Sequence, residues 1–276
     1  SMVVAAYGSG KSIAAGASAL LVENAPESAV TLRRIAKRLE NAEPAAAEVY
    51  SRLDSGARGV VIVLEGAAEV SADALREAAE AKLGRLHMKK GVSRSDPVAV
   101  LDAIAAKCRS SKRDRIAIIW DEFGRHLEAL AASGRAAELS SVQQIAEWVV
   151  RQDTPDATFT ILLHQGFFHY AGSLSQAVRN DWRKVEGRFS QIRFADDSKE
   201  MHQLIGWVVQ QTRPDSLKLP AEKAFLTAAE QARKLGFFGG FTKAQELAET
   251  LRAAYPMAPA VLHMLPRLTA RLAQNE

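Results

Sequence analysis

The sequence predicts an α/β fold, with a parallel β-sheet flanked by helices and a C-terminal part built from helices alone. Three observations predict it. Continuous apolar runs rich in β-branched residues occur along the first two thirds of the chain, as is typical of parallel strands buried on both faces. These runs alternate with helical patterns, which predicts right-handed crossovers. After Ser198 no further strand pattern occurs, so we expect two domains, residues 1–197 and residues 198–276.

The composition is that of an ordinary globular protein. The chain has 276 residues, 47% of them hydrophobic and 25% charged, which is enough for a sizeable core. No apolar run approaches the roughly 20 residues that span a bilayer, and the start does not resemble a secretory signal. The single cysteine, Cys108, excludes an intrachain disulfide, and the six scattered histidines argue against a zinc centre. We therefore expect a cytoplasmic protein without a membrane partner. Its mild formal charge of +4 permits contact with DNA without requiring it.

The first apolar run, at residues 2–6, leads into a turn bracketed by glycines and then into an alanine-rich helical pattern. The turn reads Gly8-Ser9-Gly10-Lys11-Ser12. A strand, such a turn and a helix form the layout of a phosphate-binding P-loop, in which backbone N–H groups and the helix N-terminus surround an anion. Lys11 is then expected to contact the β- and γ-phosphates of ATP, and the Ser12 hydroxyl to hold Mg²⁺. The pattern usually has glycine where this chain has Ala5, and the turn taken alone is also compatible with a flexible basic loop.

The other elements of the first domain follow in order. Two helical patterns occupy residues 31–54. Later helices are expected to begin at Ser71, at Asp96-Pro97 and at a capping box, Ser141–Gln144. The expected strands are Arg58–Leu64, Arg115–Trp120, Thr158–Leu163 and Gln191–Phe194.

The second domain shows helical patterns throughout. Its first helix carries an apolar stripe, which is Met201, Leu204, Ile205, Val208 and Val209. Pro220 and a capping box at Thr242–Gln245 start two more helices, and a last helix follows Pro259.

The strand at residues 115–120 ends in Asp121-Glu122, which is the second half of an ATPase motif. A carboxylate at the C-terminal end of the strand next to the P-loop must hold Mg²⁺ beside Ser12, and Asp121 fits this role. A second carboxylate must orient the attacking water or accept its proton, and Glu122 fits. The two acids alone would also suit a turn and a helix cap. Their order after the P-loop and their place at a strand end favour the ATPase interpretation.

Two further groups are candidates for contact with the γ-phosphate. His164-Gln165 ends the third long strand, where either side chain would sense the phosphate, with a slight preference for Gln165; a polar pair that starts a helix is the alternative. Arg188 precedes the last strand and is the best candidate for an arginine that reaches a neighbouring subunit's phosphate. A solvated basic helix is the simpler interpretation of the remaining cations, Arg179, Arg183 and Lys184.

Together these segments resemble the AAA+ and related STAND ATPases. The resemblance spans nearly the whole chain and implies Mg²⁺-dependent ATP hydrolysis that drives conformational change in an oligomer, with a helical lid beyond the core. It implies that Arg188, in Gly187-Arg188-Phe189, is an arginine finger. The segment at residues 239–244 is similar to the start of the lid helix that carries sensor 2, but it lacks the usual arginine and offers Lys243.

Shorter segments resemble large ATPases of prokaryotic phage-defence islands, of the BREX-associated kind. These segments are Ile119–Gly124 and several pieces between Tyr255 and Glu276. In those proteins the final segment continues into more protein, so the resemblance implies an ATPase module of a longer chain.

We expect an ATPase that works as a homo-oligomer or with other domains of a longer chain. The alternative is a nucleotide-gated switch that contacts DNA or a partner protein with negligible hydrolysis in isolation. A small-molecule kinase fits poorly because no acceptor site is evident.

Overall fold

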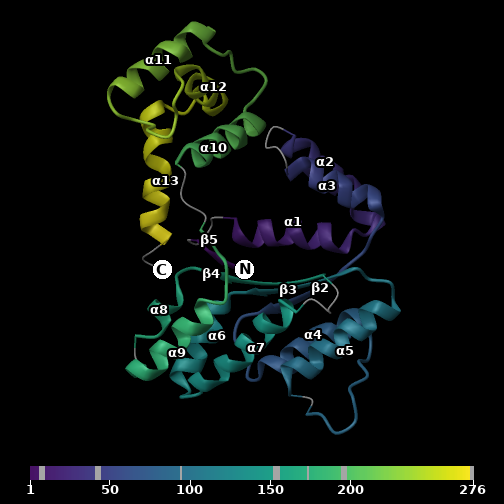
Figure 1. The fold of residues 1–276 in the computed structure, drawn as a ribbon. Helices are drawn as coiled ribbons and strands as arrows, with labels where there is room; N and C mark the ends of the chain where they lie inside the picture. Colours follow the sequence, from purple (N-terminus) through teal and green to yellow (C-terminus); the bar gives the residue numbers. More distant parts are fainter. Residues whose placement is uncertain are drawn as a thin grey trace. The chain divides into compact units, whose positions relative to one another are not determined.

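The computed structural model describes residues 1–5, 10–40, 45–93, 95–151, 156–172, 174–193 and 198–273 (Figure 1). The chain divides into two compact units, Ser1–Arg193 and Phe194–Glu276. The first unit contains the sheet, and the described part of the second is helical. The predicted α/β class with a helical C-terminal part is thereby confirmed.

The described strands form one sheet in the order β2-β3-β4-β1-β5, and every neighbouring pair is parallel. Each of the five predicted runs contains a strand, with ends that differ by a few residues. The strands are β1 (Met2–Val4), β2 (Val60–Glu65), β3 (Arg115–Asp121), β4 (Asp156–Leu163) and β5 (Gln191–Arg193).

The strand that ends in Asp121, β3, is not a direct neighbour of the P-loop strand, β1. β4 lies between them, and its Ile161 aligns with Met2 on one side and with Trp120 on the other. The end of β4 therefore lies between the two halves of the predicted site.

Helices cover both faces of the sheet (Figure 1). On one face α1 (Lys11–Glu23) packs its Ala15, Ala19 and Val22 on a cluster that includes Val61 and Ile119. The opposite face holds the larger core, and each fully buried aliphatic or aromatic side chain there contributes roughly 1.5–3 kcal/mol. Its helices are α4 (Ser71–Leu83), α5 (Pro97–Ser110), α6 (Phe123–Ala132), α7 (Leu139–Val149), α8 (Phe167–Tyr170) and α9 (Gln176–Glu186).

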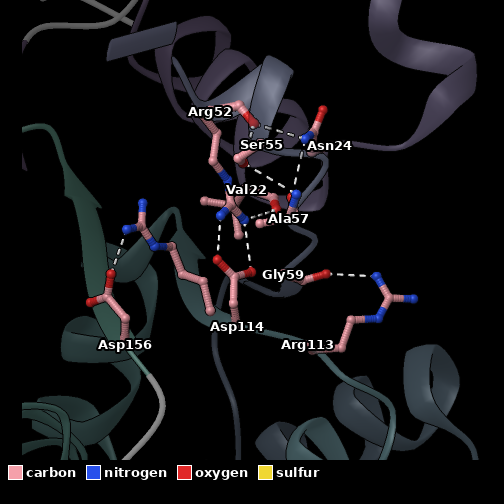
Figure 2. A network of polar contacts seen from close by, with 10 residues as sticks. Val22, Asn24, Arg52, Ser55, Ala57, Gly59, Arg113, Asp114 and Asp156 are labelled. Atoms are coloured by element: carbon pink, nitrogen blue, oxygen red, sulfur yellow. Dashed lines mark hydrogen bonds and ion pairs between the residues drawn. The ribbon is translucent and has the colours of Figure 1, made fainter. Parts of the chain in front are cut away.

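Two helices precede β2 and pack on one another, α2 (Ala29–Leu39) and α3 (Ala45–Ser55). The short 3-10 turns of this unit are Pro26–Ser28 and Ala136–Glu138. The end of α3 joins the end of α1 and the start of β3 at the amino edge of the sheet, in the polar network of Figure 2. The Arg52 guanidinium donates to both oxygens of Asp114, with 2.9 Å between Nη2 and Oδ1, and to the Val22 carbonyl at 3.1 Å.

The same network uses backbone groups. The Asn24 amide donates to the carbonyls of Arg52 and Ala57, each at 3.1 Å. Gly59, just before β2, donates its N–H to the Val22 carbonyl at 2.8 Å, and a Cβ there would lie 2.6 Å from the Val22 side chain. These bonds fix the C-terminal end of α1, the helix whose first residues are Lys11 and Ser12.

The predicted helix starts are partly correct. Asp96 is the N-cap of α5 and accepts from the Val98 N–H at 2.9 Å, with Pro97 at the first helical position, as expected. Ser71 does not cap α4, because Val70 occupies the cap and the buried Ser71 hydroxyl has no partner among the described residues.

Both predicted capping boxes are also wrong. The helix α7 begins at Leu139, two residues before Ser141, because a 3-10 turn leads directly into it. The helix α12 (Ala244–Ala254) has Lys243 at its N-cap, and no side chain bonds there.

The second unit has its own core of apolar residues, in which Phe225 of α11, Leu251 of α12 and Phe238, between these helices, are buried. Here the predicted stripe on the first helix is partly wrong: Leu204 and Val208 are 54% and 47% exposed, and the buried positions are His202 and Gly206. A Cβ at Gly206 would lie 3.1 Å from the Thr250 carbonyl, so the glycine lets two helices approach closely. The helices are α10 (Ser198–Thr212), α11 (Glu222–Lys234), α12 and α13 (Pro259–Ala273).

Across the described residues of both units, every helix is too short or too polar to cross a membrane.

Candidate active site

The candidate site begins at the N-terminus of α1. Gly10 adopts a left-handed conformation (φ 85°) that suits glycine, and the helix starts at Lys11. The first amides of a helix have no acceptor within the helix, and the first turn of α1 has no acidic residue to occupy them. This end of α1 therefore favours an anion. Gly8 and Ser9, which we expect to complete the phosphate-binding turn, lie outside the described residues.

Lys11 is buried, with 7% of its surface exposed. Its ammonium donates to the Ala5 carbonyl at 2.6 Å and lies 3.3 Å from Nδ1 of His164. Burial lowers the pKa of Lys11, and the nearby Asp121 carboxylate opposes this effect. Burial of an ammonium is costly in free energy, and a bound phosphate would reduce that cost.

Ser12 and Asp121 meet although they are far apart in the sequence. The Ser12 hydroxyl donates to Oδ2 of Asp121 at 2.8 Å, and Oδ1 accepts from the Glu122 N–H at 2.8 Å. A hydroxyl and a carboxylate oxygen are the hard ligands that Mg²⁺ prefers, and one or two carboxylates with phosphate oxygens are its usual protein environment. The two side chains therefore fit the Mg²⁺ predicted here.

Glu122 follows β3 in a left-handed conformation (φ 51°), which is unusual for a residue with a side chain. Such conformations cost about 1–3 kcal/mol and persist where the surrounding structure enforces them. Its carboxylate forms an ion pair with Arg125 at 3.2 Å and is one third exposed. The spacing of these two residues, i and i+3 at a helix start, is the sequence signal that would have found Arg125.

His164 directly follows β4, the strand that lies between β1, which leads into the P-loop, and β3, which ends at Asp121. Burial lowers the pKa of His164, the adjacent Lys11 lowers it further, and the carboxylates of Glu122 and Asp121 oppose both. A neutral imidazole accepts from Lys11 through Nδ1 and keeps an N–H on its other nitrogen. Gln165 is exposed. Of the two predicted candidates, the structure brings His164 to Lys11.

Arg188 lies elsewhere. It precedes β5 and so occupies the amino edge of the sheet, opposite to Asp121, where it is half-exposed and pairs with Glu147 of α7 at 3.2 Å. The neighbouring cations lie on α9 and make local contacts, such as Lys184 with Asp181 at 2.8 Å and Arg183 over the Phe168 ring. The structure therefore does not bring Arg188 to the site of its own chain.

One buried side chain of α6, His126, was not predicted from the sequence. His126 is buried beneath Trp120, with 4.5 Å between the ring centroids, and its Nδ1 accepts from the Ala68 N–H at 3.2 Å. Burial lowers the pKa of His126 to about 4. A histidine on an apolar helix face gives no sequence signal for such a contact. In the part of the chain that the structure describes, no three His, Cys, Asp or Glu side chains form a cluster for a metal ion.

No family model matches the chain, and no curated protein matches it. Solved structures to which it is similar include the ORC2 protein of Aeropyrum pernix, in ADPNP–ADP complexes, at 14% identity and a TM-score of 0.45. Another is Cdc6p from Pyrobaculum aerophilum, at 13% identity and a TM-score of 0.37. The matches cover 93% and 100% of this chain but only 62% and 55% of those proteins. These values describe a distant likeness of fold.

Proposed function

We propose that this protein is a P-loop ATPase of the AAA+/STAND type that binds ATP with Mg²⁺ at the carboxyl edge of its sheet and hydrolyses it. One observation carries the proposal. Three separate segments bring a buried ammonium, a hydroxyl–carboxylate pair and an imidazole together at the start of α1, with 3.3 Å between Lys11 and His164 and 2.8 Å between Ser12 and Asp121.

Each side chain has a role that its surroundings support. Lys11 binds the β- and γ-phosphates, and Ser12 and Asp121 hold Mg²⁺, which supplies charge to neutralise the phosphates. Glu122 orients the attacking water or accepts its proton. His164, in contact with Lys11, is better placed than Gln165 to sense the γ-phosphate.

Arg188 acts, in this proposal, on the site of a neighbouring subunit. Its position at the amino edge excludes action within its own site and supports a role between subunits. An arginine supplied in this way raises the rate by about three to five powers of ten, so an isolated chain would hydrolyse ATP slowly. The helical second unit would act as the lid that transmits the nucleotide state.

The second candidate function is a nucleotide-gated switch with negligible hydrolysis. The Glu122–Arg125 ion pair favours it, because the pair occupies the carboxylate that would otherwise contact the attacking water. In either case we propose a cytoplasmic module of a longer phage-defence protein that acts on DNA or on a partner domain. The short segments at residues 119–124 and 255–276 support this role.

ATP turnover per chain, measured with Mg²⁺ over a range of protein concentrations and with or without DNA, tests the proposal. Glu122→Gln is the matched control, since it keeps the size of the side chain. A turnover per chain that rises with protein concentration and disappears in Glu122→Gln supports an assembled ATPase. ATP binding with no turnover at any concentration supports the switch, and the absence of ATP binding refutes both.

A further inference from the structure

The turn between β3 and α6 holds Glu122 in a conformation that the residue does not adopt by preference. Two bonds lie within the turn itself: the Glu122 N–H to Oδ1 of Asp121 at 2.8 Å, and the Arg125 N–H to the Glu122 carbonyl at 3.0 Å. Both form between near neighbours in the sequence. They do not attach the turn to the rest of the unit.

Gly124 supplies a close contact between the turn and the rest of the unit. A Cβ at this position would lie 2.3 Å from Oη, 2.7 Å from Cζ and 3.0 Å from Cε1 of Tyr170. The Tyr170 ring therefore rests directly on the backbone of the helix start, in a space that any other residue would fill. Tyr170 is buried in the large core, so the ring cannot move away without losing that packing.

The ring comes from the segment that follows β4. Tyr170 ends the short helix α8, six positions after His164, and the preceding Phe167 packs on Phe123 with 5.8 Å between ring centroids. Phe123 in turn meets the Trp120 ring edge to face at 5.0 Å. Trp120 and Phe123, which flank the Asp121-Glu122 pair, thus belong to one buried aromatic cluster with Phe167.

We propose that Tyr170 is a positioning residue for Glu122: its ring, seated on Gly124, holds the β3–α6 turn in the conformation that directs the Glu122 carboxylate. The proposal rests on the proposed function, in which Glu122 acts on the attacking water. Tyr170 acts through the turn and not on the nucleotide, so it should affect the chemical step and leave nucleotide binding unchanged.

Three variants separate the ring from its hydroxyl. Tyr170→Phe keeps the ring and should retain the single-turnover hydrolysis rate within about threefold. Tyr170→Leu removes the atoms over Gly124, and Gly124→Ala inserts a methyl group into them. Each should lower the rate by about 10- to 100-fold, the loss expected from a displacement of about 1 Å at a reacting group, with the nucleotide Kd within about twofold of wild type.

The double variant Gly124→Ala/Tyr170→Leu tests whether the two residues act through their contact. Leucine lacks all three atoms that the added methyl group would meet. Gly124→Ala should therefore cost little further rate in the Tyr170→Leu background, although it is costly alone. Additive losses would overturn the proposal.

The control for general loss of packing is Phe159→Leu, which truncates another buried ring of the same core, in β4. It should lower the melting temperature about as much as Tyr170→Leu does and leave the hydrolysis rate near wild type. Amide hydrogen exchange at residues 122–125 gives a readout independent of catalysis. It should rise about tenfold in Tyr170→Leu and Gly124→Ala and stay unchanged in Phe159→Leu.

The outcomes distinguish this inference from the proposed function. If wild type hydrolyses no ATP, the proposed function fails, and the exchange measurement alone decides whether Tyr170 holds the turn. Faster exchange at residues 122–125 only in the two Tyr170–Gly124 variants supports the inference. Unchanged exchange, a wild-type rate in Tyr170→Leu, or a loss of nucleotide affinity that parallels the loss of rate would each overturn it.

Discussion

The two edges of the sheet use charged side chains in different ways. At the amino edge, the Arg52 guanidinium binds both oxygens of one carboxylate and a helix-end carbonyl (Figure 2). The hydrogen bonds from Arg52 lower the pKa of the Asp114 carboxyl. At the carboxyl edge, the buried Lys11 ammonium contacts a carbonyl oxygen and an imidazole, and Glu122 occupies a strained conformation. The amino edge pairs its charges with one another, whereas the carboxyl edge holds a buried ammonium and a strained residue.

Different variants should therefore separate the two edges. Changes at the carboxyl edge should alter nucleotide chemistry more than stability, and changes at the amino edge should do the reverse.

Glu122→Gln should lower the hydrolysis rate by about 10²–10⁴-fold, because an amide cannot accept a proton from water. The left-handed backbone and the Asp121 bond do not depend on the carboxylate, so the nucleotide Kd should remain near that of wild type. Single-turnover kinetics and equilibrium binding of a fluorescent ATP analogue measure the two quantities. A rate within threefold of wild type would exclude Glu122 as the base.

Lowering the pH should destabilise the protein through His126. The pKa of His126 is about 4 in the folded state and near 6.5 in the unfolded state. Between these values the unfolded chain binds a proton at His126 and the folded chain does not. The effect of His126 on the free energy of unfolding is therefore absent above pH 6.5. It grows as the pH drops toward 4, and below that it lowers the free energy of unfolding by about 3 kcal/mol.

The control for this titration is His126→Gln, which keeps an acceptor for the Ala68 N–H and removes the ionisable ring. Urea unfolding at pH 7, 6, 5 and 4 measures the slope in both proteins. The difference between the slopes belongs to His126, since both proteins share every carboxylate. Equal slopes would show that His126 is accessible to protons in the folded state.

Lys11→Ala should weaken ATP binding by roughly 10- to 100-fold, the loss of about 1.5–3 kcal/mol from one charged hydrogen bond. The free energy of unfolding should not fall, because the change also removes a buried charge. Isothermal titration and urea unfolding test the two parts. Lys184→Ala, at an exposed pair on α9, is the matched lysine control and should alter neither.

Arg52→Ala should lower the free energy of unfolding by about 2 kcal/mol, because it removes the bonds to Asp114 and to the Val22 carbonyl. The value is discounted because Asp114 is partly exposed. Arg33→Ala, which breaks an exposed pair with Asp54, should cost less than about 1 kcal/mol. Well below the melting temperature, ATP affinity should be unchanged in both. A large loss of affinity in Arg52→Ala would mean that the two edges are not independent.

Features that depend on neighbouring residues could be predicted from the sequence. Apolar runs predicted the strands, Asp96-Pro97 predicted the start of α5, and two motifs separated by about 110 residues predicted the pair that Ser12 and Asp121 form. Each of these features follows from strand ends and helix starts, which neighbouring residues determine.

The sequence was insufficient where tertiary packing decides. Ser71 and Ser141 carry capping side chains, but the helices begin where the core requires them. On α10, the close approach to α12 at Gly206 turned the helix so that part of its apolar stripe is exposed. The contact of Tyr170 with Gly124 joins residues 46 positions apart, and neither residue type predicts it.

The position of β1 has a consequence for folding. This three-residue strand inserts between β4 and β5, so Met2 pairs with Ile161 and Gln191, both more than 150 positions away. Closing such long loops is slow, and it must precede any contact between Lys11 and His164. The nucleotide site therefore forms only when the whole sheet is assembled. A nucleotide bound there would oppose global unfolding rather than local opening, and its effect on stability would grow with the logarithm of its concentration.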